Sequence, residues 1–198
     1  MSFSEEIVSW YAKNKRALPW RETKDPYKVW LSEIILQQTR VEQGLPYYLK
    51  FIDAYPTVFH LAAATDEAVL KLWQGLGYYT RARNLHATAR YVAGSLNGVF
   101  PQTYKELLTL KGVGDYTASA VASICFNEPT PVVDGNVYRV LSRYFNVAIP
   151  VDSAEGAIYF KTLAQELLCR KDPSAYNQGI MEFGAVQCKP KSPDCGVC

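Results

Sequence analysis

The sequence lacks features that would place it in several large classes of protein. No apolar run approaches 18 residues, which excludes a membrane-spanning helix. The first residues lack the basic and apolar regions of a secretory signal peptide, so we expect a reducing intracellular compartment. Glycine and proline number 12 and 11 in 198 residues, too few to indicate collagen or extended disorder. The formal net charge of +2 is too small to indicate a nucleic-acid partner on its own.

Strand patterns are equally scarce. Strict alternation of apolar and polar residues is rare, whereas apolar spacings typical of helices recur along the whole chain. We find no repeat and no flexible linker, and we predict ten helices joined by short turns. They centre on or run through residues 7–11, 26–35, 41–51, 66–73, 81–92, 103–106, 115–125, 137–144, 155–168 and 173–186. The sequence therefore predicts an all-α protein.

One turn between two predicted helices carries two glycines, Gly112 and Gly114. Because glycine has no side chain, backbone N–H groups can approach another backbone closely there. The helix that begins near Asp115 adds the positive end of its dipole. This combination indicates a binding site for a phosphate. The alternative is an ordinary structural turn between two helices.

Glu33 is a second candidate for chemistry. It precedes Gln37 by four residues, on the same helix face, and its flanks are apolar. A carboxyl in such surroundings is partly desolvated, which raises its pKa and allows it to act as a general acid. The alternative is a solvated glutamate on an amphipathic helix.

Three of the five cysteines, Cys188, Cys195 and Cys198, crowd the end of the sequence, which core packing would not predict. Thiolates at this spacing suit zinc and also an iron–sulfur cluster. Cys125 and Cys169 stand alone in apolar surroundings and are expected in the core.

Long motifs resemble the MutY-type adenine DNA glycosylases of the helix-hairpin-helix superfamily that includes endonuclease III. The matching segments are 18–21, 26–39, 73–85, 107–118, 133–136 and 176–185, and the resemblance they mark extends over nearly the whole chain. The resemblance implies a two-lobed, all-α helix-hairpin-helix glycosylase fold. A six-helix barrel is expected at 23–127, and a lobe that holds a 4Fe-4S cluster is expected from 1–22 and 128–198.

The resemblance also assigns catalytic roles. Glu33 would protonate the adenine ring, and Asp134 would stabilise the cation left on the deoxyribose, with Asn136 as a hydrogen-bond partner. One carboxyl must therefore be protonated and the other ionised. Tyr116 stands where bifunctional relatives carry the lysine that forms a Schiff base. A tyrosine cannot form one, so the resemblance implies a monofunctional hydrolase that leaves an abasic site.

An enzyme that acts on a base in duplex DNA must pull that base out of the stack. Gln38 and Tyr78 match residues that wedge into the duplex, and Gln178 matches a position that recognises the adenine edge. Further implied contacts to base or DNA are Trp20, Arg21, Gln37, Gly112 and Gly114. Candidates for phosphate contacts are Arg40, Arg81, Arg83, Lys111, Lys189 and Lys191. The implied partner is double-stranded DNA with A:8-oxoguanine or A:G mismatches. The resemblance also implies that the protein is a monomer. It implies a location in the cytoplasm, associated with the nucleoid in a bacterium.

The sequence departs from the family pattern at its end. Cys188, Cys195 and Cys198 match three ligands of the 4Fe-4S cluster, but the fourth cysteine of the pattern is missing. The C-terminal domain that helps relatives to recognise 8-oxoguanine is also absent. We therefore expect a fragment of a longer protein, or a chain that binds its cluster poorly.

Two other functions remain open from the sequence. One is a mismatch thymine glycosylase of the same superfamily, which can also carry tyrosine in the hairpin and a downstream aspartate. The other is a non-catalytic helix-hairpin-helix module that binds DNA, although such a module has no need of Glu33, Asp134 and the cysteines together.

Overall fold

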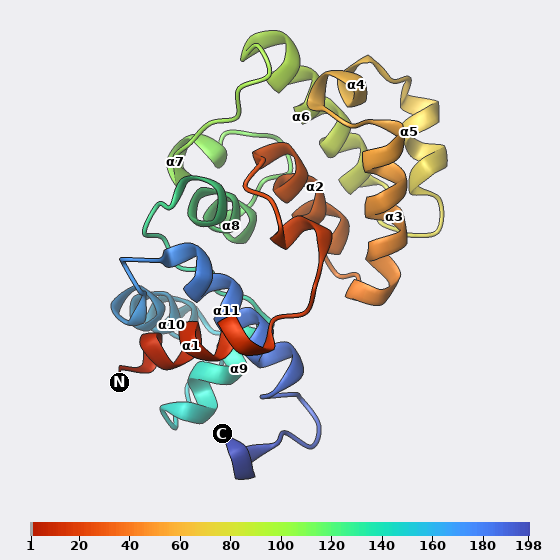
Figure 1. The fold of residues 1–198 in the computed structure, drawn as a ribbon. Helices are drawn as coiled ribbons and strands as arrows, with labels where there is room; N and C mark the ends of the chain where they lie inside the picture. The colour runs from red at the N-terminus through yellow and green to blue at the C-terminus, as the bar shows by residue number, and fades with distance from the viewer. Residues whose placement is uncertain (1) are drawn as a thin grey trace. The chain divides into compact units, whose positions relative to one another are not determined.

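Helices and the turns between them make up residues 2–198, which are the residues described by the computed structural model (Figure 1). The described helices are α1 (Phe3–Asn14), η1 (Pro19–Arg21), α2 (Pro26–Leu36), α3 (Val41–Ala54), α4 (Val58–Ala63), α5 (Asp66–Trp73), α6 (Thr80–Ser95), α7 (Tyr104–Leu107), α8 (Asp115–Phe126), α9 (Gly135–Tyr144), α10 (Ala154–Leu167), α11 (Pro173–Val186) and η2 (Cys195–Val197). The all-α prediction is confirmed, and each of the ten predicted helices is present. The short helix α4 was not predicted.

The chain divides into two compact units. Unit 1 consists of residues 1–17 and 122–198, and unit 2 consists of residues 18–121. Each boundary lies a few residues before the one we predicted. Residues 18–22 join unit 2 because the Trp20 ring packs edge-on against Tyr48 of α3, with 5.1 Å between the ring centroids. The second boundary falls inside α8.

Unit 2 is built around α2. Asp25 caps this helix by accepting a hydrogen bond from the Tyr27 N–H at 3.0 Å, and Pro26 occupies a first-turn position that suits proline. Trp30, Leu31 and Ile35 have no exposed surface, as expected for a helix that is apolar on most of its faces. Helices α3 and α6 pack against α2, and α4 and α5 pack against α6 (Figure 1).

Unit 1 is held together by α11. The glycine at position 179 lets α1 lie close, since an added Cβ there would stand 3.0 Å from side-chain atoms of Ile7 and Tyr11. Beside this crossing, Arg16 donates from Nε and Nη2 to the two carboxylate oxygens of Glu182, at 2.8 and 2.7 Å. The Glu182 side chain is fully buried, so this bidentate pair satisfies a charge that would otherwise be costly. Helix α9 packs on the same α11 (Figure 1).

None of the described helices combines the length and the apolar character that crossing a lipid bilayer requires.

Candidate functional site

Asp134 is the N-cap of α9 in unit 1. One carboxylate oxygen accepts the backbone N–H groups of Asn136 and Val137 at 2.9 and 2.8 Å. The other oxygen accepts from Nδ2 of Asn136 at 2.8 Å. A helix N-terminus favours negative charge, and these three donors all point at one carboxylate. The local structure therefore fixes the orientation of an anionic group that is half-buried.

Arg139 fixes the amide of Asn136, a role the sequence did not reveal. Its Nη2 donates to Oδ1 of Asn136 at 2.7 Å and to the carbonyl of Gly184 at 2.7 Å. Its Nε donates to the carbonyl of Cys188 at 2.8 Å. Because Oδ1 faces the guanidinium, Nδ2 is left to face Asp134. A continuous set of hydrogen bonds thus joins the cysteine segment to the Asp134 carboxylate.

Gln178 lies on α11, also in unit 1, with its side-chain amide engaged by neighbours. Its Oε1 accepts from the Tyr11 hydroxyl at 3.1 Å, and its Nε2 donates to the carbonyl and the hydroxyl of Ser174 at 3.4 and 3.3 Å. Recognition of a base edge by this amide would require these bonds to be exchanged. The preceding residue, Asn177, holds the backbone that leads to Asp134 through bonds to Thr130 and Val132.

Glu33 lies in unit 2, near the end of α2, with only 8% of its surface exposed. The alternative of a solvated glutamate is therefore wrong. One turn later, Gln37 follows the helix and donates from Nε2 to the hydroxyl of Thr117 on α8 at 3.3 Å. This bond joins the end of α2 to the second helix of the hairpin. The two predicted catalytic carboxyls thus belong to different units, each built by its own packing.

Gln38 and Tyr78, the two predicted wedge residues, are exposed and stand on unusual backbone. Their φ angles are +55° and +47°, in the left-handed region that residues with a side chain seldom adopt. Tyr78 exposes 69% of its surface. Both lie in unit 2, in the turns that precede α3 and α6.

The orientation of Arg81 does not favour its predicted contact with a phosphate. Its guanidinium is turned inward, where it donates to the carbonyls of Ile34 and Ile35 at 3.1 and 3.0 Å and to that of Gln37. Burial lowers the pKa of Arg81 from its usual value. Nη1 is thus used by backbone at the end of α2, and Nη2 donates to the carbonyls of Leu76 and Gly77 before α6.

The two glycines of the hairpin turn have different surroundings. Gly112 has a φ of +78°, and an added Cβ would lie 2.7 Å from Cβ of Asn84 on α6. At Gly114 an added Cβ would meet nothing within 4 Å, so the space beside this residue is open. The hydroxyl of Thr88 anchors the turn on α6 by donating to the Lys111 carbonyl at 2.8 Å. Tyr116 follows in the first turn of α8 and is half-buried.

Trp20 and Arg21, predicted to line the base pocket, lie in η1 of unit 2. Trp20 is buried against Tyr48, with 7% of its surface exposed, and Arg21 is half-buried.

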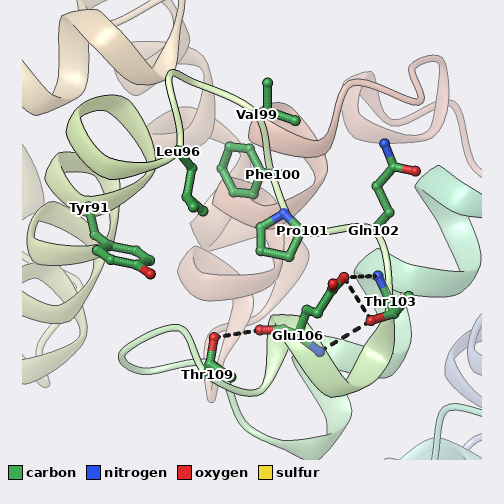
Figure 2. A pocket seen from close by; sticks show the side chains of 9 residues that line it. All are labelled: Tyr91, Leu96, Val99, Phe100, Pro101, Gln102, Thr103, Glu106 and Thr109. Carbon is green, nitrogen blue, oxygen red and sulfur yellow. Dashed lines mark hydrogen bonds between the residues drawn. The ribbon is translucent and has the colours of Figure 1, made fainter.

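An open pocket of unit 2, shown in Figure 2, involves neither Trp20 nor Arg21. It is lined by Tyr91, Leu96, Val99, Phe100, Pro101, Gln102, Thr103, Glu106 and Thr109. Its one carboxylate, Glu106, caps α7 through Thr103, so the pocket holds none of the predicted site residues.

The three C-terminal cysteines lie in one neighbourhood of unit 1. Burial raises the pKa of the Cys198 thiol, and the nearby Cys188 and Cys195 raise it further. Sγ of Cys188 accepts from Nη1 of Arg143 at 3.4 Å. Within residues 2–198, however, no three His, Cys, Asp or Glu side chains are gathered closely enough to hold a metal ion. Cys125 and Cys169 are half-buried rather than enclosed in the core.

Comparison with known proteins places this helical arrangement in one family. A family model described as "HhH-GPD superfamily base excision DNA repair protein" matches residues 31–155. That match covers more than half of the chain. The chain belongs to the HhH-GPD superfamily of base excision DNA repair proteins.

The curated relatives are more specific. The chain is 40% identical to the adenine DNA glycosylase of Buchnera aphidicola subsp. Baizongia pistaciae over 197 residues, which cover 99% of this chain and 56% of that protein. It is 42% identical to the adenine DNA glycosylase of Homo sapiens over 206 residues, which cover all of this chain and 38% of the human protein. The chain thus spans about half, or less, of the length of these relatives.

Solved structures support the same fold. The structure of a thermostable thymine-DNA glycosylase matches with a TM-score of 0.89 and 30% identity, over 99% of this chain and 90% of that one. An endonuclease III in a non-covalent DNA complex matches with a TM-score of 0.81 over 98% and 88% of the two chains. At 22% identity, the endonuclease III match establishes the fold alone.

Proposed function

We propose that this chain is the catalytic region of a monofunctional adenine DNA glycosylase that removes adenine paired with 8-oxoguanine or guanine in duplex DNA. The observation that carries the proposal is the identity of 40% and 42% to adenine DNA glycosylases, which extends over essentially the whole chain. A mismatch thymine glycosylase is the second candidate, because the thermostable thymine-DNA glycosylase matches with a TM-score of 0.89 at 30% identity.

The proposed reaction uses the two carboxyls in opposite states. Glu33, enclosed on α2, donates its proton to a ring nitrogen of adenine, and the base leaves with the electron pair of the glycosidic bond. The cation on the sugar is stabilised by the ionised carboxylate of Asp134. Water then adds to the sugar carbon and gives a proton to Glu33. Asn136 and Arg139 keep the Asp134 carboxylate in one orientation throughout.

Tyr116 determines the product in this proposal. A phenol cannot form an imine with the sugar, so the strand is left intact at an abasic site. Gly112 and Gly114 bring backbone N–H groups of the hairpin to a phosphate. Gln38 and Tyr78 enter the duplex where the adenine leaves the stack.

The cysteines of unit 1 match part of a cluster site in donor type, although within residues 2–198 they are not gathered as metal ligands. Cys188, Cys195 and Cys198 supply three thiolates, the donor type that a 4Fe-4S cluster requires, and Arg143 places positive charge beside Cys188. A bound cluster would supply thiolate–iron bonds that cross-link the segment after α11. Arg139 joins the same segment to Asn136, so order in this segment would also support the Asp134 carboxylate.

Duplexes that carry A opposite 8-oxoguanine, A opposite G, and T opposite G test the proposal under single-turnover conditions. We expect release of adenine from the first two, with strand breaks only after alkali, and no adduct on borohydride reduction. The iron content of the same anaerobic preparation tests the cysteine assignment, with a Cys195→Ser variant as its control.

Each contrary result has a distinct meaning. Release of thymine alone would support the second candidate, and binding without release of any base would support a non-catalytic module. Borohydride trapping with coupled strand scission would show that an amine, rather than water, attacks the sugar. Iron at the same low level in both proteins would contradict the cluster assignment.

A further inference from the structure

Two exposed side chains of unit 2, Gln38 and Tyr78, stand on left-handed backbone in turns that lie forty residues apart in the sequence. Neither residue is a glycine, so each conformation costs free energy, and such conformations persist only where the surroundings hold them. In both turns, the carbonyl that directly precedes the left-handed residue accepts a hydrogen bond from the same side chain, Arg81 of α6.

The first turn is held through Nη1 of Arg81. This nitrogen donates to the carbonyl of Gln37, which precedes Gln38, and to the carbonyls of Ile34 and Ile35. The last carbonyls of a helix have no partner within the helix. Arg81 therefore satisfies the open end of α2 and fixes the peptide from which the Gln38 side chain projects.

The second turn is held through Nη2 of Arg81. This nitrogen donates to the carbonyls of Leu76 at 3.2 Å and Gly77 at 3.5 Å. The guanidinium carbon also lies 5.1 Å from the ring centroid of Trp73 and 5.7 Å from that of Tyr78. Nε1 of Trp73 donates to the same Gly77 carbonyl at 2.9 Å. One guanidinium thus lies over the Tyr78 ring while its N–H groups bind the backbone before Tyr78.

We propose that Arg81 is a positioning residue that holds the Gln38 turn and the Tyr78 turn in a fixed relation, so that both side chains enter DNA together. The proposal rests on the proposed function for the assignment of Gln38 and Tyr78 to DNA. Lysine cannot replace arginine here, because a single ammonium group lacks the planar fork whose nitrogens reach both turns at once. Arg81→Lys therefore keeps the charge and removes the bridge.

The test in the free protein uses amide hydrogen exchange at one protected N–H in each turn. The Thr39 N–H donates to the Leu36 carbonyl, and the Leu76 N–H donates to the Trp73 carbonyl, both at 3.1 Å. Arg81→Lys is expected to speed exchange at both amides by roughly tenfold or more. In the unaltered protein, local opening of either turn must break the hydrogen bonds to Arg81, and without those bonds opening costs less free energy. The control is Arg90→Lys on the same helix, whose exposed side chain contacts Asp66 at 3.2 Å, and it is expected to leave both rates unchanged.

Faster exchange in only one turn, or equally faster exchange throughout unit 2, would overturn the proposal. The unaltered protein supplies a second measurement, which applies even if Arg81→Lys fails to fold. Across a series of low denaturant concentrations, the Thr39 and Leu76 amides are expected to share one opening free energy. Separate values would show that the two turns open independently of each other.

The test with DNA measures whether Arg81 acts through Tyr78. Arg81→Lys is expected to lower the single-turnover excision rate by roughly tenfold or more, since small displacements of inserted groups are costly. Combining it with Tyr78→Ala should add little further loss, because both changes remove the same function. Losses that multiply fully would contradict the proposal. If the unaltered chain releases no base, the proposed function fails, while the exchange experiment still tests Arg81.

Discussion

At the scale of single residues, Asp134 combines a structural and a proposed chemical role in one carboxylate. It caps α9 through two backbone N–H groups, and it is the proposed anion that faces the sugar cation. Asparagine caps helices about as well as aspartate but carries no charge. The two roles can therefore be separated by a single substitution.

Asp134→Asn is expected to abolish base release while the protein keeps its stability to within about 1 kcal/mol and still binds the mismatched duplex. Single-turnover excision, urea unfolding and duplex binding measure the three properties. Asp134→Ala is the matched control, because it removes the cap as well and should cost up to about 2 kcal/mol of stability, more than the asparagine variant. Excision by the asparagine variant at the rate of the unaltered chain would remove Asp134 from the reaction.

The sequence predicted Asp134 and Asn136 but did not predict Arg139 or the inward orientation of Arg81. Asp134 and Asn136 lie two residues apart in the sequence, so a short sequence motif can identify both. The partners of Arg139 lie as far away as Cys188, and those of Arg81 as far away as Ile34. Which basic residue turns inward depends on which carbonyls the fold leaves open, and helical periodicity carries no information on that point.

At the scale of elements, the crossing of α9 and α11 depends on Gly184. An added Cβ there would lie 2.7 Å from Cβ and 2.9 Å from the carbonyl oxygen of Asn136. Backbone at this distance cannot turn away as a flexible side chain can. The close approach therefore places α11 directly against the first turn of α9, where Asn136 holds Asp134.

Gly184→Ala is expected to lower the free energy of unfolding by roughly 1–3 kcal/mol and to reduce base release by more than the stability change explains. Gly94→Ala on α6 is the matched control. An added Cβ there meets nothing within 4 Å, and alanine is the better helix former by about 0.5–1 kcal/mol, so this variant should gain stability. Urea unfolding and single-turnover excision measure both variants, and equal stability of the two would refute the tight crossing.

Helices with long periodic patterns could be predicted from the sequence. Helix α4, which was not predicted, shows why length matters. Helix α4 has six residues, Val58–Ala63, between Pro56 and Thr65. Six residues give fewer than two turns, too few for a helical period to stand out. Val58 and Leu61 are both buried, so tertiary packing stabilises this helix although its sequence shows no clear helical period.

At the scale of the whole molecule, buried phenols link stability to alkaline pH. Burial raises the pKa of Tyr48 from 10 to about 12, and it also raises the pKa of Tyr27 and Tyr176. The folded state favours the neutral phenol. Its contribution to stability is therefore fully present below pH 10 and is lost as the pH rises from 10 toward 12.

We expect the free energy of unfolding to fall steeply above pH 10, and Tyr48→Phe to remove on the order of 2 kcal/mol of that fall. Tyr91→Phe is the matched control, because the Tyr91 residue is 48% exposed rather than buried. Urea unfolding at a series of pH values from 9 to 12 measures the effect. Identical pH dependence in the Tyr48 variant and in the unaltered chain would contradict the assignment.

Unit 1 is assembled from the two ends of the chain, and this has a consequence for synthesis on the ribosome. Every residue of unit 2 has been made once Val121 is added, and its helices then have their partners. Helix α1, made before unit 2, must wait for α11 and position 179 before Ile7 and Tyr11 can be covered. Throughout elongation those two apolar side chains are therefore available to other proteins. Helix α1 therefore leaves the ribosome before every helix of unit 2, yet it is covered only after unit 2 is complete.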